Sequence, residues 1–269
     1  MIPKIIHYCW FGGNPLPELT QKCIASWKKH CPDYEIIEWN ESNFDIHCCD
    51  YVQEAYEAKK WAFVSDVARL FALVNYGGIY MDTDVEVLKP LDNLLSYEAF
   101  SGFEAVDRIT TGIMACCKDQ PLFTEFYESY KDDHFLREDG TMDTTTNVTR
   151  ITDACLKYGV QLNNTMQTVN GLTLFPKDYF CPKDFYSGGL SITDNSYTIH
   201  HYDGSWLDDE EKEAQKLREK YAKVLPYRLA GIFSRIIVIL KFHGFVGVLK
   251  EGYHRIRVVL KTNNKSGVN

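Results

Sequence analysis

The sequence contains no two cysteines in the C-x-x-C spacing, and its nine cysteines are an odd number. Two pairs are directly adjacent, Cys48–Cys49 and Cys116–Cys117. This pattern fits neither a disulfide framework nor a zinc ribbon. We therefore expect reduced and mostly buried thiols, as in a protein of the cytosol.

The N-terminal stretch MIPKIIHYCWFGG lacks a basic segment followed by a long apolar run and a small-residue cleavage site. We expect no secretory signal and a mature chain that starts at Met1. The apolar stretch near the C-terminus is interrupted by Arg235, Lys241 and His243, which makes it a poor candidate for a transmembrane helix.

The 269 residues are 45% hydrophobic and 14% aromatic, which is enough for a sizeable core. The formal charge of −8 is unevenly distributed. Residues 226–269 carry eight lysines and arginines against Glu251 alone, a net of +7 that leaves −15 on residues 1–225. The sequence predicts an acidic body with a basic C-terminal segment.

The N-terminal third has the pattern of a parallel α/β sheet. PKIIHYCWF reads as a buried strand closed by glycines, a helix follows over about 19–30, and YEIIEWN reads as a second strand. In WAFVSDVARLFALVNYGG the apolar residues recur at helical spacing until Gly77 ends the helix. The short strand Ile79–Met81 then leads into DTD.

Two aspartates, Asp82 and Asp84, stand one residue apart where that strand ends. If the chain stays extended, both side chains leave the same face. Ligands of open parallel sheets collect at the carboxyl ends of strands. Two carboxylates there suit Mg²⁺ or Mn²⁺, which complete their shells with phosphate oxygens and water. The pair predicts a metal–phosphate site.

Polar residues in two other segments are candidates for the same site. Asp66 and Arg69 interrupt the apolar helix one turn apart, either as a local ion pair or as a pair that holds sugar hydroxyls. In SYTIHHYDGSW the adjacent His200 and His201 point to opposite faces of a strand, so one of them can reach the metal. An imidazole ligand favours Mn²⁺ over Mg²⁺.

Four segments in this order resemble the DXD-motif sugar transferases of glycosyltransferase family 32: IPKIIHYCWFGG, SWKKHCPDYEIIEW, SDVARLFALVNYGGIYMDTDVEVLKPLD and IHHYDGSW. This family includes capsular polysaccharide synthesis enzymes and yeast mannosyltransferases, and is similar to the catalytic domain of the large glucosylating toxins. The likeness covers about residues 1–206. It implies a GT-A fold, in which a Rossmann-like mixed sheet flanked by helices binds a nucleotide sugar.

The resemblance also assigns roles to the N-terminal candidates. Trp10 matches a tryptophan that stacks on uracil, which favours a UDP-sugar donor. Asp66 and Arg69 match residues that hold the donor sugar. Asp82 matches the first D-x-D aspartate, which contacts ribose and sugar, and Asp84 matches the second, which binds the metal. The residues expected to be catalytic are Asp66, Arg69 and Asp82.

The C-terminal motif transfers less directly. The resemblance favours His200 as a metal ligand, with His201 and Asp82 also candidates. Ser205 and Trp206 match residues that close over the diphosphate, although the spacing differs. Asn147, in TTTNVTR, stands near a polar segment that faces donor or acceptor, and a helix-capping role fits it equally.

The expected activity is a metal-dependent, retaining transfer of a sugar to a glycan acceptor in capsule or surface polysaccharide synthesis. No further Asp or Glu stands out as a nucleophile, so same-face attack is favoured. One alternative is a haloacid-dehalogenase-type phosphatase, whose D-x-D also follows a strand, but its G-D-x-x-x-D pair is missing. Another is a catalytically inactive sugar-binding protein tethered to a membrane.

The basic C-terminal segment mixes long apolar side chains with spaced cations. It predicts a catalytic domain over 1–210 and a helical, amphipathic extension over 211–269 that lies on an anionic membrane surface. A helical cap packed on the catalytic domain is the alternative. The expected location is the cytoplasm, peripheral on the inner face of the cell membrane, with a lipid-linked acceptor. No nucleic-acid recognition motif accompanies the charge.

Overall fold

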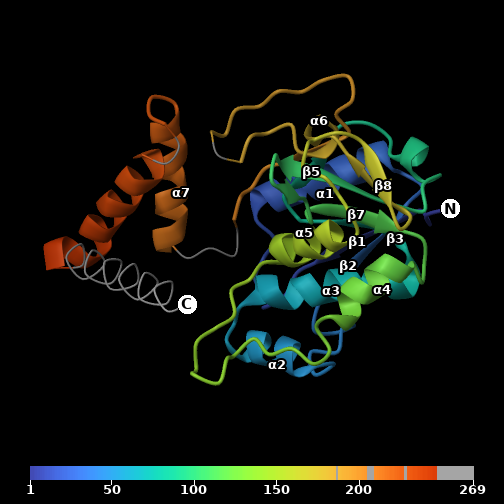
Figure 1. Ribbon diagram of the computed structural model, residues 1–269, viewed down its shortest axis with the longest axis horizontal. Coiled ribbons are helices and arrows are strands. Elements are labelled where there is room, and N and C mark those ends of the chain that lie inside the picture. The colour runs from blue at the N-terminus through green and yellow to red at the C-terminus, as the bar shows by residue number, and fades with distance from the viewer. Residues whose placement is uncertain (186, 205–208, 227–228, 247–269) are drawn as a thin grey trace, which may run out of the picture. The chain divides into compact units, whose positions relative to one another are not determined.

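The computed structural model describes residues 1–185, 187–204, 209–226 and 229–246. The described residues divide into two compact units. The first, 1–185 with 189–204, is an α/β body, and the second, 187–188 with the described part of 209–246, is helical (Figure 1). The assignment of catalysis to 1–210 and of attachment to 211–269 stays a prediction.

The first unit alternates strands and helices along the chain. Its helices are α1 (Glu18–His30), α2 (Asp50–Glu57), α3 (Trp61–Tyr76), the 3-10 helix η1 (Asp92–Leu94), α4 (Pro121–Glu128), α5 (Asn147–Lys157) and α6 (Lys177–Phe180). Its strands are β1 (Ile5–Cys9), β2 (Glu35–Trp39), β3 (Gly78–Met81), β4 (Val85–Val87), β5 (Ala99–Ala105), β6 (Arg108–Ile109), β7 (Ile113–Cys116), β8 (Gln167–Val169), β9 (Leu172–Phe175) and β10 (Thr198–His200).

The main sheet is mixed. Its order is β2-β1-β3-β7-β5-β9-β8, with β6 paired to β5. Strands β2, β1 and β3 are parallel, as predicted, whereas β7 runs antiparallel to both β3 and β5. A separate antiparallel pair joins β4 to β10. A mixed sheet flanked by helices is the fold class expected for GT-A enzymes, and this prediction is confirmed.

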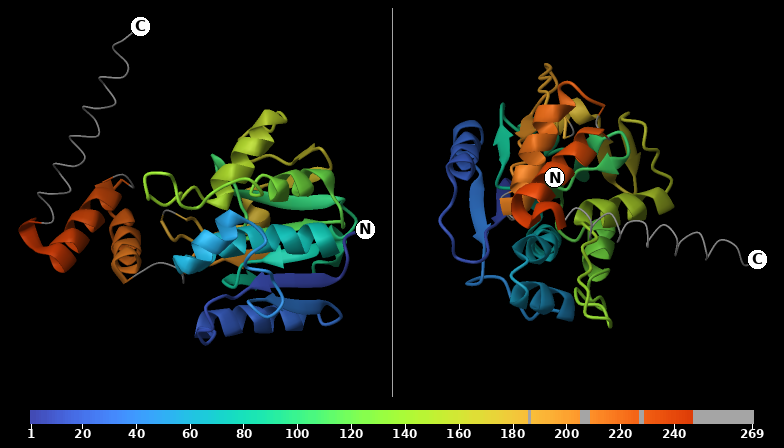
Figure 2. Two further views of the ribbon diagram at one scale, coloured as in Figure 1. Left: turned by 90° about the horizontal axis from the view of Figure 1, so that it is seen from below. Right: turned by 90° about the vertical axis from the view of Figure 1, so that its left-hand side faces the viewer.

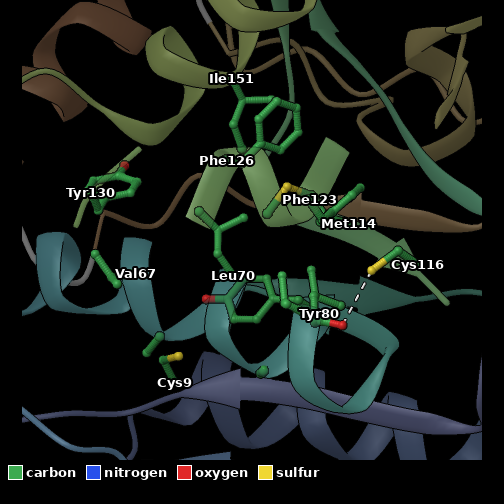
Figure 3. Close-up of a cluster of buried hydrophobic side chains, with 14 of the residues drawn as sticks. Cys9, Val67, Leu70, Tyr80, Met114, Cys116, Phe123, Phe126, Tyr130 and Ile151 are labelled. Carbon is green, nitrogen blue, oxygen red and sulfur yellow. Dashed lines mark hydrogen bonds between the residues drawn. The ribbon is translucent and has the colours of Figure 1, made fainter. Parts of the chain in front are cut away.

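Helices cover both faces of the main sheet, with α1 on one side of β1 and α3 on the other (Figure 2). Strand β3 feeds both cores: Ile79 and Met81 pack in the cluster that contains α1, and Tyr80 packs in the cluster of α3 and α4. Figure 3 shows Leu70 of α3 and Phe123 of α4 in this second cluster. A strand buried on both faces holds its carboxyl end firmly.

Glycines make the sharp entry into β3. Gly77 ends α3 with φ 66°, and Gly78 follows with φ 105°, a region that residues with a Cβ rarely adopt. A Cβ on Gly78 would lie 2.7 Å from the carbonyl oxygen of Ile5. The predicted helix end at Gly77 is confirmed. The nine cysteines are free thiols and six of them are buried, so they serve mainly as small core side chains.

The second unit contains α7 (Asp209–Ala222) and a helix over Leu229–Val246. Lys241 bonds Glu213 at 2.8 Å and His243 bonds Glu210 at 2.8 Å, which ties the two helices together. The predicted helical character holds over these residues, and the rest of the extension lies outside the described part. By length and composition, Leu229–Val246 meets the criterion for a membrane span, contrary to expectation, because it contains only two charged residues, Arg235 and Lys241.

Candidate functional site

The two aspartates lie in a tight turn between β3 and β4. The backbone N–H of Val85 donates to the carbonyl of Asp82 at 3.0 Å, which closes the turn. The chain is therefore not extended here, which was the condition for both side chains to leave one face, because β4 turns away to pair with β10. The turn nevertheless directs the carboxylates of Asp82 and Asp84 to one place.

His200 completes this group from the end of β10. Its Nε2 atom lies 3.3 Å from Asp84 Oδ1 and 3.9 Å from Asp82 Oδ2. The candidate ligand atoms of the three residues all lie within 4.8 Å of one another. Neighbouring oxygen ligands around an octahedral ion at about 2.1 Å stand roughly 3 Å apart, so the spacing fits one hard divalent cation. We call Asp82, Asp84 and His200 the metal cluster.

The electrostatics of the cluster favour a charged Asp84. Burial alone would raise its pKa, but His200 and the backbone N–H of Asp203, which donates to Oδ2 at 2.8 Å, lower the pKa to about 2. Burial lowers the pKa of His200, and Asp84 outweighs it and raises that pKa well above its ordinary value. A carboxylate that stays ionised is ready to bind a cation.

His201 lies apart from the cluster. Its Nε2 atom is 2.9 Å from Glu86 Oε2, and Glu86 also pairs with Lys22 at 3.0 Å. The adjacent histidines therefore face opposite ways, as the strand period requires. Of the two metal-ligand candidates, the structure brings His200 to the aspartates and pairs His201 with another carboxylate.

Arg69 joins the D-x-D turn to α3. Its Nη2 atom is 3.1 Å from Asp66 Oδ1, its Nη1 atom is 3.2 Å from Asp82 Oδ1, and Nη1 also donates to the carbonyl of Thr111 at 3.0 Å. Burial raises the pKa of Asp66 to about 6, although Arg69 opposes the shift. The pair is thus more than a local ion pair within the helix.

Asn147 begins α5 beside Asp66. Its backbone N–H donates to Asp66 Oδ2 at 3.3 Å, and its Nδ2 donates to the Asp66 carbonyl at 3.1 Å. The capping side chain of α5 belongs to Thr146. The Oδ1 atom of Asn147 is buried and has no hydrogen-bond partner among the described residues. Asn147 therefore orients Asp66 and keeps one acceptor unused.

Trp10 follows β1, the neighbour of β3, so it stands at the same edge of the sheet as Asp82. Its ring is partly exposed, and Nε1 donates to the carbonyl of Asn14 at 2.6 Å. This position is compatible with a stacking role. Ser205 and Trp206 lie outside the described residues.

The comparisons with known proteins concern this same edge. Residues 17–101 match the family model described as a glycosyltransferase sugar-binding region containing a DXD motif. This segment is therefore similar to the sugar-binding region of DXD-motif glycosyltransferases. It contains Asp66, Arg69, Asp82 and Asp84, whereas His200 and Asn147 come from elements beyond it.

Curated relatives of the DXD region include fungal enzymes. The chain is 34% identical over 128 residues to an inositol phosphoceramide mannosyltransferase of Schizosaccharomyces pombe, covering 46% of this chain and 36% of that protein. It is 25% identical over 224 residues to an uncharacterized glycosyltransferase of Acanthamoeba polyphaga mimivirus, covering 77% of this chain and 84% of the other. The matched part of the chain thus spans about a third of the fungal relative.

Among solved structures, the PaToxG glycosyltransferase matches with a TM-score of 0.45 and 18% sequence identity, over 58% of this chain and 69% of that one. A galactosyltransferase solved with donor and acceptor sugar analogs matches with a TM-score of 0.39 and 13% identity, over 82% of this chain and 96% of the other. Similarity at this level supports no argument about substrates.

Around the DXD region the structure adds residues that sequence patterns do not reveal. Gly112 packs against the metal cluster: a Cβ there would lie 2.7 Å from the His200 ring and 3.3 Å from Asp82 Oδ2. Glu104, on β5, is 7% exposed, and burial raises its pKa to about 7 against the opposing effect of His200. Neither residue belongs to a motif, because both act through contacts between distant segments.

Proposed function

We propose that this protein is a metal-dependent glycosyltransferase that takes its sugar from a nucleoside diphosphate sugar, with a UDP-sugar favoured. The observation that carries the proposal is the metal cluster at the end of β3. Its candidate ligand atoms lie within 4.8 Å of one another, and it stands next to the Asp66–Arg69 pair. Carboxylates and one imidazole are a ligand set that suits Mn²⁺ and also Mg²⁺.

The side chains divide into two groups by task. Asp84 and His200 would hold the cation. Asp82 faces both groups, because its Oδ2 lies near His200 and its Oδ1 pairs with Arg69. When bound, the cation supplies positive charge to the diphosphate and stabilises the leaving nucleoside diphosphate. The acidic cluster would otherwise repel that diphosphate. Arg69 and Asp66 bind and orient the donor sugar.

Retention by same-face attack is the favoured stereochemical course. Asp66 cannot approach the sugar carbon freely, because Oδ1 pairs with Arg69 and Oδ2 accepts the N–H of Asn147. Arg69 assists by positioning, because a guanidinium stays protonated at neutral pH and cannot act as a general acid or base. The departing phosphate oxygen then takes the acceptor proton.

The acceptor is proposed to be a glycan carried on a lipid, in capsule or surface polysaccharide synthesis. The fungal relatives are named for mannosyl transfer to inositol phosphoceramide, a lipid, which supports a lipid-linked acceptor here. The helix Leu229–Val246 and the basic residues that follow it support attachment to the anionic inner face of the cell membrane.

The test is incubation of the purified protein with UDP- and GDP-sugars and Mn²⁺, while nucleoside diphosphate and inorganic phosphate are measured separately. We expect diphosphate release that depends on Mn²⁺ and disappears in Asp84→Asn. The matched control is Glu86→Gln, a carboxylate in the adjoining strand that pairs with His201 instead. Release of phosphate would indicate the phosphatase, and sugar binding without any release would indicate the inactive binding protein.

A further inference from the structure

The segment 110–112 touches both halves of the proposed site. Its Thr111 carbonyl accepts from Arg69 Nη1 at 3.0 Å. The Gly112 carbonyl accepts a hydrogen bond from the backbone N–H of Asp82 at 2.8 Å. Gly112 also lies so close to His200 that a Cβ on it would be 2.7 Å from the His200 ring. A shift of this segment would therefore move the sugar-binding arginine and the metal cluster together.

Thr110 fixes the segment from within. Its side chain is completely buried, and its Oγ1 accepts the backbone N–H of Gly112 at 3.1 Å. Its backbone is held on both sides: the N–H donates to the Gly102 carbonyl at 2.9 Å, and the carbonyl accepts from Ser101 Oγ at 2.8 Å. Of these contacts, the one made by the hydroxyl is the one that a substitution of Thr110 itself can remove.

Glu104 lies next to this hydroxyl. The pairing between β5 and β6 is irregular between Phe103 and Ala105, a feature that re-aims side chains near functional sites. Burial raises the pKa of Glu104 to about 7, and the Thr110 side chain is among the groups that oppose this shift.

We propose that Thr110 is a positioning residue. Through its hydroxyl it holds segment 110–112 in the conformation that fixes the positions of Asp82, Arg69 and His200 relative to one another. The inference rests on the proposed metal site. Partners behind the ligands of a metal commonly change its affinity or the activity by about 10- to 100-fold when removed. Thr110 would act in that way without touching the donor.

The test compares three variants of the full chain. Thr110→Val keeps the shape and removes the hydroxyl, and Thr110→Ser keeps the hydroxyl. Thr173→Val removes a buried threonine hydroxyl of β9, which bonds Thr168 at 3.0 Å. Mn²⁺ affinity is titrated in the absence of donor, and thermal unfolding is recorded for each protein.

We expect Thr110→Val to weaken Mn²⁺ binding about tenfold or more and to lower kcat more than it raises KM, with Thr110→Ser and Thr173→Val near wild type. Wild-type Mn²⁺ affinity in Thr110→Val would overturn the inference, whatever the activity. Equal losses in Thr110→Val and Thr173→Val would also overturn it, because they would reflect stability alone.

These outcomes separate the inference from the proposed function. If the wild type binds Mn²⁺ but releases no nucleoside diphosphate from any donor, the proposed function fails and the Mn²⁺ titration alone decides the role of Thr110. If the wild type does not bind Mn²⁺, both are overturned.

Discussion

Arg69 and Asp82 form the contact that joins α3 to the D-x-D turn. The Nη1 atom of Arg69 lies 3.2 Å from Asp82 Oδ1, and the same guanidinium pairs with Asp66 at 3.1 Å. The Arg69 side chain is 7% exposed and sits 4.6 Å from the centre of the Tyr80 ring. The buried guanidinium of Arg69 thus pairs with two carboxylates, those of Asp66 and Asp82.

Arg69→Met should therefore destabilise the protein strongly. Removing one partner of a buried ion pair leaves uncompensated charge and costs about 3–5 kcal/mol. Arg69→Lys should recover only part of the loss, because an ammonium cannot bridge two carboxylates with a planar fork. Urea unfolding measures both values.

The control is Arg137→Met. Arg137 pairs with Asp143 at 3.1 Å, but its side chain is 55% exposed. Its removal should change the free energy of unfolding by no more than about 0.5 kcal/mol. Equal losses at the two arginines would contradict the view that Arg69 acts as a buried bridge.

The two adjacent histidines should behave differently in a metal titration. His200→Ala removes the imidazole that lies 3.3 Å from Asp84, so Mn²⁺ affinity should fall by at least about tenfold. His201→Ala should leave it near the wild-type value, because that ring bonds Glu86. Isothermal titration of both variants with Mn²⁺ measures the two affinities. A larger loss in His201→Ala than in His200→Ala would show that the metal binds on the other face of β10.

How much of this site the sequence predicts depends on distance along the chain. Asp66, Arg69, Asp82 and Asp84 stand within one helix–strand unit. The pattern marks all four as candidates, but it leaves Asp66 and Arg69 open between a local ion pair and a sugar-binding pair, and only the family resemblance assigns them to the donor. The two carboxylates were expected to share a face only if the chain stayed extended. The turn that replaces this conformation could not be predicted, because the pairing of β4 with β10 depends on a segment more than a hundred residues later.

Gly112 and Thr110 could not be predicted for the same reason. The Thr111 carbonyl is 42 positions from Arg69, and no pattern within either segment announces their contact. The α/β class was predictable because strand and helix periods are local properties of the chain, whereas the mixed sheet was expected only from the family resemblance. The antiparallel insertion of β7 between β3 and β5 was not, because it depends on which strand edges meet.

Acid should destabilise the fold through His7, which lies in the middle of β1. Its side chain is buried, Nδ1 accepts from Trp39 Nε1 at 3.1 Å, and Nε2 lies 2.8 Å from the Gly77 carbonyl. Burial lowers the pKa of His7 from its ordinary 6.5 to about 4, against the opposing effect of Gly77. Both nitrogens have partners that suit the neutral ring.

Because the pKa is lower in the folded state, the unfolded state binds the proton first as pH falls. Stability from this residue is complete above pH 6.5 and is lost as pH falls toward about 4, by on the order of 3 kcal/mol. Urea unfolding at pH 7 and pH 4.5 measures the slope. His7→Asn should have a flatter dependence, and an identical slope would show that other groups cause it.

The helix Leu229–Val246 should bind to membrane surfaces. Along Leu229–Val246 the exposed apolar residues include Ile232, Phe233 and Ile236, which recur at the spacing of one helical face. We expect the full chain to float with vesicles that contain anionic lipids, because this face buries in the interface while the following cations bind the headgroups. A chain ending at Tyr221 should remain in the dense fraction.

Substitutions test whether flotation depends on this helical face or on exposed apolar side chains in general. Replacing Ile232, Phe233 and Ile236 by Ser should abolish flotation, whereas Leu156→Ser, an exposed apolar residue of α5, should not. Carbonate extraction then distinguishes the mode of attachment, because a surface helix is released and a spanning helix is retained. Equal flotation of the full chain and the chain ending at Tyr221 would mean that the acidic body binds the vesicles, and the C-terminal segment would lose its proposed role.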